Sequence, residues 1–226
     1  STYNIATTLS TSRAYPTNLQ MVTFLDNHDL PRIASICSEN MRDQALFFQF
    51  LLRGLPMITY GTEFGLEGEK EPQNRTPIHW DKEPILAPLI RDLTQLRRDH
   101  PVLERGEIEI IDATSQYVFF LQRNESETAY IAINMSNETQ EFSLPVERIG
   151  FRVQERVLSK LDDSIILPQE VGVWFTSSSL SKVEMIDVHF EIEAPMDKPL
   201  YVIGSAIEIG GWNPTKAFPL QQEGNL

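Results

Sequence analysis

A run of polar residues that could do chemistry follows a short apolar segment near the start of this 226-residue chain. The segment is residues 21–25, and Asp26-Asn27-His28-Asp29 comes directly after it. Ionisable and amide groups at the end of a buried strand are costly unless they form a site or pair with one another. A carboxylate beside an imidazole can hold hydroxyl groups, such as those of a sugar, in a fixed orientation. The alternative is that Asp29 caps the next helix and that His28 has its hydrogen bonds satisfied at an edge.

A second apolar run, residues 55–60, also ends in polar residues, of which Glu63 is the ionisable one. Between the two runs, the spacing predicts an amphipathic helix over residues 41–53. Gly54 suits the left-handed position after that helix, and Pro56 prevents its continuation. Strand, helix and strand in this order predict a parallel pair whose polar ends share one edge of a sheet, the edge where barrel enzymes keep their chemistry. The expected apolar stripe of the helix is Met41, Ala45, Phe48 and Leu52.

Two motifs in this order resemble the α-amylase family of glycoside hydrolases. They are Asn27-His28-Asp29 and Gly54-Leu-Pro-Met-Ile-Thr-Tyr60-Gly61-Thr-Glu63. The resemblance implies that the two strands are the seventh and eighth of a (β/α)₈ barrel and that residues 84–99 form its final helix. It also implies that Asp29 stabilises the transition state without being the nucleophile, and that His28 and Asn27 bind the sugar.

The loop after the second strand looks like the family's loop that grips a more distant sugar with an acid and an arginine. The matching positions are Glu71 and Arg75, although aspartate is more usual than glutamate at the first. The alternative is a salt bridge within the loop that binds no ligand.

The family cleaves α-glucosidic bonds with retention, using a nucleophilic aspartate and an acid/base glutamate about 5 to 5.5 Å apart. The resemblance places both on the fourth and fifth strands, which would precede Ser1. We therefore expect neither carboxylate in this chain, and we expect the chain alone to be inactive because a closed barrel takes about 250 residues. The expected function is part of a retaining, α-amylase-like glycosidase acting on starch or maltodextrins. The alternatives are a transglycosidase of the same family and a non-catalytic carbohydrate-binding protein.

After residue 101 the pattern changes to short alternating runs separated by turn residues, with residues 152–158 expected as one strand among them. This pattern predicts an antiparallel β-sandwich domain over residues 102–176. Residues 177–182 have the composition of a linker. Residues 183–226 resemble the first strands of a starch-binding β-sandwich module, in which Trp212 would stack on a glucose ring; the alternative is that Trp212 packs under a turn. Trp174 is expected in the core, and Trp80 is expected to pack against the barrel. The predicted fold class is therefore α/β plus all-β, with residues 1–101 as the end of the barrel.

The composition excludes several partners. Nineteen basic and 32 acidic residues give a net charge of −13, most of it after residue 101, so nucleic acid and anionic membrane surfaces would be repelled. No transmembrane segment or signal peptide is apparent. The expected partner is starch or another α-glucan, and an extracellular location is expected because granular starch cannot enter a cell. Calcium is common in the family, but no residue here is assigned to a metal, and the oligomeric state is left open.

Overall fold

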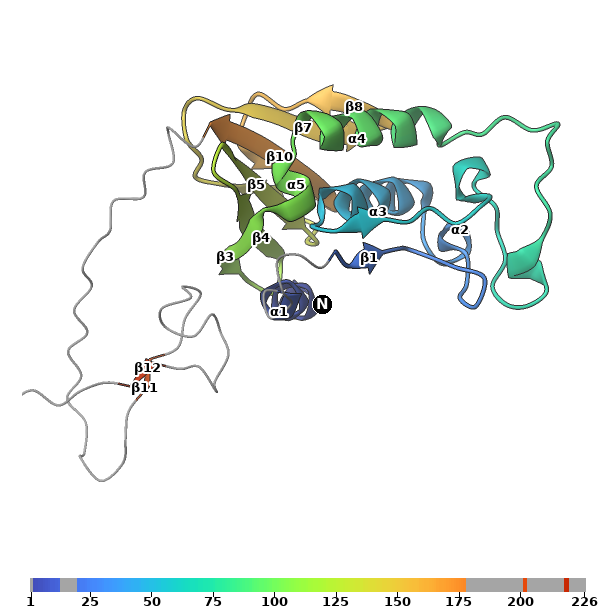
Figure 1. Ribbon diagram of the computed structural model, residues 1–226, viewed down its shortest axis with the longest axis horizontal. Helices are drawn as coiled ribbons and strands as arrows, with labels where there is room; N and C mark the ends of the chain where they lie inside the picture. The colour runs from blue at the N-terminus through green and yellow to red at the C-terminus, as the bar shows by residue number, and fades with distance from the viewer. Residues whose placement is uncertain (1, 13–19, 178–200, 203–217, 220–226) are drawn as a thin grey trace, which may run out of the picture.

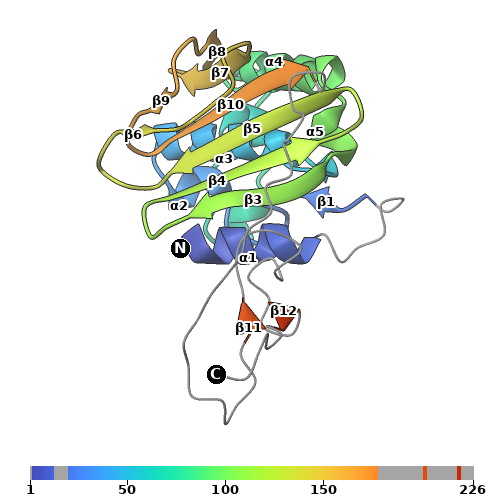
Figure 2. The same cartoon turned by 90° about the vertical axis from the view of Figure 1, so that its left-hand side faces the viewer.

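The computed structural model describes residues 2–12, 20–177, 201–202 and 218–219 (Figure 1). Its main body is a large antiparallel sheet with helices packed against one face (Figure 2). The residues of the candidate site follow a small parallel strand pair beside this helical layer.

The parallel pair consists of β1 (Val22–Thr23) and β2 (Leu55–Pro56), joined in register by Val22 opposite Leu55. α2 (Ile33–Ile36) and α3 (Glu39–Leu51) lie between the two strands in the sequence. The predicted order of strand, helix and parallel strand is therefore confirmed. The second strand is shorter than the predicted run 55–60, because this ladder has only two strands among the described residues.

Gly54 makes the approach of these two strands possible. Its φ is +113°, a conformation that side chains rarely adopt, and a Cβ there would lie 2.2 Å from the carbonyl oxygen of Met21. The predicted positive φ of Gly54 is confirmed, but α3 ends at Leu51 with Leu52 as its C-cap, so Gly54 lies one residue beyond the C′ position.

The predicted apolar stripe of α3 is wrong. Met41 is exposed, and Phe48 is only partly buried, whereas the fully buried apolar residues fall elsewhere on the helix. The reason is that α3 is covered on more than one side, since it contacts the sheet, α2 and α4. The apolar residues that it buries are Leu46, Phe47, Phe50 and Leu51.

The final helix of the helical part, α4 (Ala87–Asp99), starts three residues later than predicted. Its N-terminal flank is held instead by the backbone, because Leu86 N–H donates to the carbonyl of Glu63 at 2.9 Å. Of the apolar residues in and just before this helix, Leu86, Leu89, Leu93 and Leu96 are buried, whereas Ile85 is 39% exposed. α5 (Val102–Arg105) follows at once, and α1 (Thr2–Ser12), which the sequence did not predict, packs against the edge of the sheet.

The six-stranded sheet has the order β3-β4-β5-β10-β7-β8, and all its pairs are antiparallel. The strands are β3 (Glu107–Ala113), β4 (Tyr117–Arg123), β5 (Glu127–Asn134), β7 (Ile149–Gln154), β8 (Val157–Lys160) and β10 (Glu170–Ser177). A separate two-stranded ladder joins β6 (Gln140–Glu141) to β9 (Ile165–Ile166). The strand expected over residues 152–158 is instead a hairpin, because Glu155 and Arg156 turn the chain with φ of 48° and 64°.

Both faces of the sheet are buried. One face and the helices form a single core that includes Phe47, Leu93, Phe120 and Val173. The other face holds a smaller aromatic cluster around Trp174, whose side chain is fully buried as expected and whose indole N–H donates to the carbonyl of Asp163 at 2.8 Å.

The predicted starch-binding module and its Trp212 lie outside the described residues, apart from β11 (Tyr201–Val202), which pairs with β12 (Phe218–Pro219). Almost all of the predicted linker also lies outside them. Among the described residues, no helix is long and apolar enough to cross a membrane.

Candidate functional site

The predicted site begins with a tight turn after β1. Asn27 organises this turn, because its Oδ1 accepts the backbone N–H of Asp29 at 2.8 Å and its carbonyl accepts that of Leu30 at 3.3 Å. The turn presents the next two side chains outward, and those of His28 and Asp29 are each 65% exposed. His28 Nε2 lies 3.3 Å from Asp29 Oδ2. A carboxylate and an imidazole therefore stand side by side at the surface.

The alternative that Asp29 caps the next helix is wrong. The first backbone N–H of α2, on Ile33, donates instead to Asp26 Oδ2 at 2.9 Å. The capping role thus belongs to the buried Asp26, and Asp29 is left at the surface.

The loop after β2 reaches back to this turn through Arg75. Its Nη2 lies 3.3 Å from Asp29 Oδ1, its Nη1 lies 3.0 Å from Glu71 Oε1, and its Nε donates to the carbonyl of His28 at 3.1 Å. The structure therefore brings Asn27, His28, Asp29, Glu71 and Arg75 together. The Glu71–Arg75 pair is also what the alternative, a salt bridge within the loop, requires, so the geometry is compatible with both interpretations.

Asn74 anchors the same loop beneath the exposed residues. Its side chain is buried, and its amide donates to the carbonyls of His28 at 2.9 Å and Leu30 at 3.1 Å. The next residue, Arg75, is the predicted site arginine. The short helix η2 (Gln73–Arg75) therefore holds the position of Arg75 relative to Asp29.

A buried ion pair connects the segments that carry these exposed residues. Arg32 Nη1 lies 3.6 Å from Asp26 Oδ1, and the two side chains are only 1% and 3% exposed. Arg32 also donates to the carbonyls of Asn74 at 2.9 Å and Tyr60 at 2.8 Å, and its guanidinium lies 4.8 Å from the centroid of the Tyr60 ring. One side chain thus joins the turn after β1, the end of the second motif and the loop. Sequence reasoning missed Arg32; the one available signal was that Asp26, at the end of an apolar run, needs a counter-charge.

The second motif forms a compact turn beside this ion pair. Thr59 Oγ1 donates to the Asp26 carbonyl at 2.7 Å, and Thr62 Oγ1 lies 3.3 Å from Asp26 Oδ1. η1 (Thr62–Phe64), which carries Glu63, is flanked by Gly61 and Gly65 at φ of 86° and 68°. A Cβ on Gly61 would lie 2.3 Å from Leu66, so this glycine is required by both conformation and space.

Trp80 lies on the loop that leads from η2 to α4, and its predicted packing against the barrel is limited to one ring contact, with Phe64. Its side chain is 80% exposed, and its ring meets Phe64 edge-on at 6.0 Å between centroids.

No group of three or more His, Cys, Asp or Glu side chains that could hold a metal ion occurs in the described part of the chain.

Known proteins resemble this chain over part of its length. Residues 2–106 match the family model "Alpha amylase, catalytic domain". The chain is 32% identical over 146 residues to a cyclomaltodextrinase from Geobacillus thermopakistaniensis (strain MAS1), covering 61% of this chain and 25% of that protein. It is 33% identical over 132 residues to a cyclomaltodextrin glucanotransferase from Paenibacillus macerans, covering 58% and 18%.

The fold is also shared with solved structures. An alpha-amylase from Geobacillus thermoleovorans, complexed with acarbose, superposes with a TM-score of 0.60 at 23% identity, over 76% of this chain and 42% of that one. The chain spans about a quarter or less of the length of the two curated relatives above. These matches support the interpretation of the chain as an α-amylase family fragment.

Proposed function

We propose that this chain supplies one wall of the active site of a retaining, α-glucan-active glycosidase. The observation that carries the proposal is the exposed Asp29 carboxylate, which lies 3.3 Å from both His28 and Arg75 at the end of a strand parallel to its neighbour. Relatives named as a cyclomaltodextrinase and a cyclomaltodextrin glucanotransferase favour an α-glucan as the substrate.

In the proposed mechanism, Asp29 and His28 hydrogen-bond the hydroxyls of the sugar next to the cleaved bond. The transition state carries positive charge on the sugar ring, so a fixed carboxylate nearby stabilises it more than it stabilises the substrate. Asn27 fixes the turn, and Arg75 with Glu71 binds a more distant sugar of the same chain. We assign neither the nucleophile nor the general acid to any residue of these 226.

Substitution of Asp29 tests this role in a protein that includes the rest of a catalytic barrel. Asp29→Asn should lower kcat on maltodextrin by about 10² to 10³, the usual effect of removing one preorganised electrostatic group. Glu67→Gln is the matched control, because Glu67 is an exposed carboxylate nearby on the chain, and it should stay within about twofold of the parent. Equal kcat in Asp29→Asn and the control would refute the proposed role.

The 226-residue chain alone is proposed to be inactive, which release of reducing ends from starch by the purified chain would contradict. Glucan transfer is the second candidate reaction, favoured by the match to a glucanotransferase. Product analysis separates the two reactions, because hydrolysis releases one reducing end for each bond cleaved and transfer does not. A non-catalytic carbohydrate-binding protein is the third candidate, and binding of maltodextrin without any measurable turnover by the protein that includes the rest of the barrel would favour it. An extracellular location stays a proposal.

A further inference from the structure

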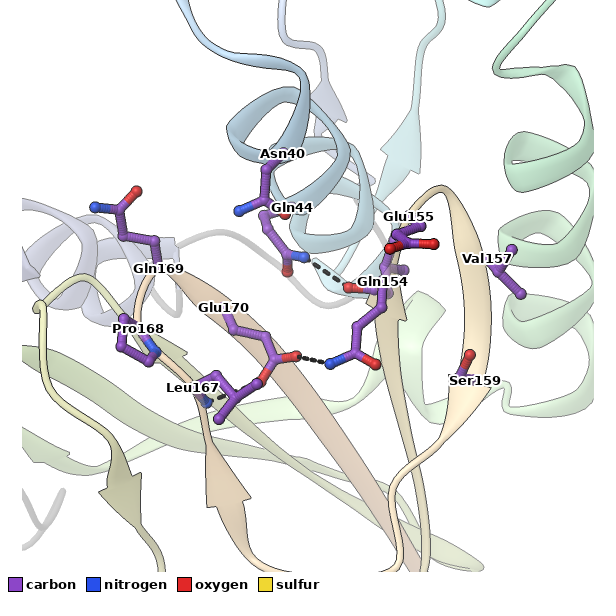
Figure 3. A pocket seen from close by; sticks show the side chains of 11 residues that line it. Asn40, Gln44, Gln154, Glu155, Val157, Ser159, Leu167, Pro168, Gln169 and Glu170 are labelled. Carbon is purple, nitrogen blue, oxygen red and sulfur yellow. Dashed lines mark hydrogen bonds between the residues drawn. The ribbon is translucent and has the colours of Figure 1, made fainter.

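A pocket of about 650 Å³ lies between the first turns of α3 and the hairpin β7–β8, away from the residues of the candidate site (Figure 3). The start of β10 and the loop before it close the third side. Residues from four elements thus meet around one hollow that the proposed function does not use.

The inner wall of the pocket consists of polar groups already bonded within the protein. Gln44 donates to the Val153 carbonyl at 2.7 Å and accepts the Val171 N–H at 2.9 Å. Glu170 is buried; its Oε2 accepts the Leu167 N–H at 2.8 Å, and its Oε1 lies 3.4 Å from Arg152. These groups fix the shape of the wall and do not need a ligand.

The rim, by contrast, carries polar groups that the described part of the protein leaves available. Asn40, Glu155 and Ser159 have no side-chain hydrogen bond to the described residues, and Gln154 uses only its Nε2, toward Glu170 at 3.4 Å. Figure 3 shows these side chains around the mouth of the pocket together with the small apolar surfaces of Val157, Leu167 and Pro168.

The charges at the pocket limit the class of ligand. No Lys, Arg or His lines it, so an anionic ligand would find no counter-charge and would be repelled by Glu155. The carboxylate of Glu170 is already paired with Arg152, which leaves Glu155 as the single unpaired carboxylate for a cation. The combination of amides, a hydroxyl and apolar surfaces instead suits a neutral ligand rich in hydroxyl groups, and the volume suits a small oligosaccharide.

We infer that this pocket is a second binding site for a neutral oligosaccharide, remote from the chemistry. The choice of an α-glucan as the ligand rests on the proposed function. The inner wall of the site is formed before binding, because Gln44 of α3 bonds to the backbone of both β7 and β10. A preformed site loses less conformational entropy when it binds.

Amide NMR spectra of the 226-residue chain, titrated with maltotriose, test the inference at the residues concerned. The side-chain amide signals of Asn40, Gln154 and Gln169 should shift to saturation, and that of the exposed Gln116, in the turn between β3 and β4, should not. Gln154→Ala should weaken binding about five- to tenfold, the effect of one lost hydrogen bond. Gln116→Ala is the matched control and should leave the affinity unchanged.

Asn40→Ala gives a second test that does not depend on the fold of the hairpin, because Asn40 is exposed and loses no bond within the described protein. It should weaken binding by a similar factor with an unchanged melting temperature. Glucose 6-phosphate should bind at least about tenfold more weakly than glucose, because its charge meets Glu155.

Unshifted amides at Asn40, Gln154 and Gln169 would overturn the inference, as would wild-type affinity in both alanine variants. Equal or tighter binding of the phosphorylated sugar would overturn the assignment of a neutral ligand. Each of these results leaves the expected effect of Asp29→Asn on kcat untouched, so the second site can fail while the proposed function stands.

Discussion

Arg32→Met should be among the most destabilising single substitutions in this chain. The substitution removes the counter-charge of Asp26, at 3.6 Å, while that carboxylate stays 3% exposed, and it also removes hydrogen bonds to the carbonyls of Asn74 and Tyr60. Loss of one partner of a buried ion pair typically costs about 3 to 5 kcal/mol. For a chain of this size, that loss should lower the melting temperature by about 6 to 20 °C.

Urea unfolding of three further variants distinguishes the effect of losing the ion pair from the effect of losing an arginine side chain in general. Arg91→Met, on the exposed side of α4, is the matched control and should change the free energy of unfolding by about 0.5 kcal/mol or less. Arg32→Lys should fall between the wild type and Arg32→Met, because lysine keeps the charge but cannot form the same fork of hydrogen bonds. The double variant Asp26→Asn, Arg32→Met should recover part of the loss, since no unpaired charge is then buried. A loss below about 1 kcal/mol in Arg32→Met, or a double variant no more stable than the single one, would refute the reasoning.

Three further predictions concern the rest of the molecule. The hydrogen bond that the Tyr117 hydroxyl donates to Asp112, together with burial, raises the pKa of Tyr117 to about 12. The contribution of this hydrogen bond to stability should be complete below the ordinary tyrosine pKa of about 10 and lost as the pH rises to about 12. An equal pH dependence of the free energy of unfolding in Tyr117→Phe would contradict this. Trp174→Ala should lower the free energy of unfolding in urea by about 3 to 5 kcal/mol, because it empties the centre of the smaller core. Trp174→Phe loses the hydrogen bond to Asp163 but keeps an aromatic ring, so it should lower the free energy of unfolding clearly less. Equal losses in the two variants would contradict the packing argument. Val22 and Leu55 are exposed apolar neighbours on the parallel pair, so light scattering should show that the wild-type chain associates. Association should fall in the double variant Val22→Lys, Leu55→Lys and persist in the control Val146→Lys. A monodisperse wild-type monomer would disprove this expectation.

The order of elements could be predicted from the sequence where a local signal exists. The apolar runs and Gly54 predicted the parallel pair correctly. The buried face of α3 could not be predicted, because its neighbours on more than one side come from distant parts of the chain. The hairpin between β7 and β8 was missed because Glu155 and Arg156 adopt left-handed backbone conformations without the glycine or asparagine that usually signals such a turn.

The candidate site shows the same limit. The motifs predicted five residues that do lie together, from Asn27 to Arg75, although their roles stay predictions. The residues beneath them, Arg32 and Asn74, were not predicted, since each takes its importance from partners some 30 or more residues away along the chain. Sequence motifs thus identified the exposed residues of the candidate site, whereas the residues that support them were seen only in the structure.

The interior shared by the helices and the sheet restricts how this protein could be recombined with its relatives. Phe47 and Leu93 on one side of residue 106, and Phe120 and Val173 on the other, belong to a single core, and Gln44 of α3 bonds to the backbone of both β7 and β10. A crossover placed after the catalytic-domain match would separate side chains that have adapted to one another's shapes. Chimaeras of that design should fold well only when the donor brings both partners of these contacts, so we expect the strand-rich half to be exchangeable only together with its helices.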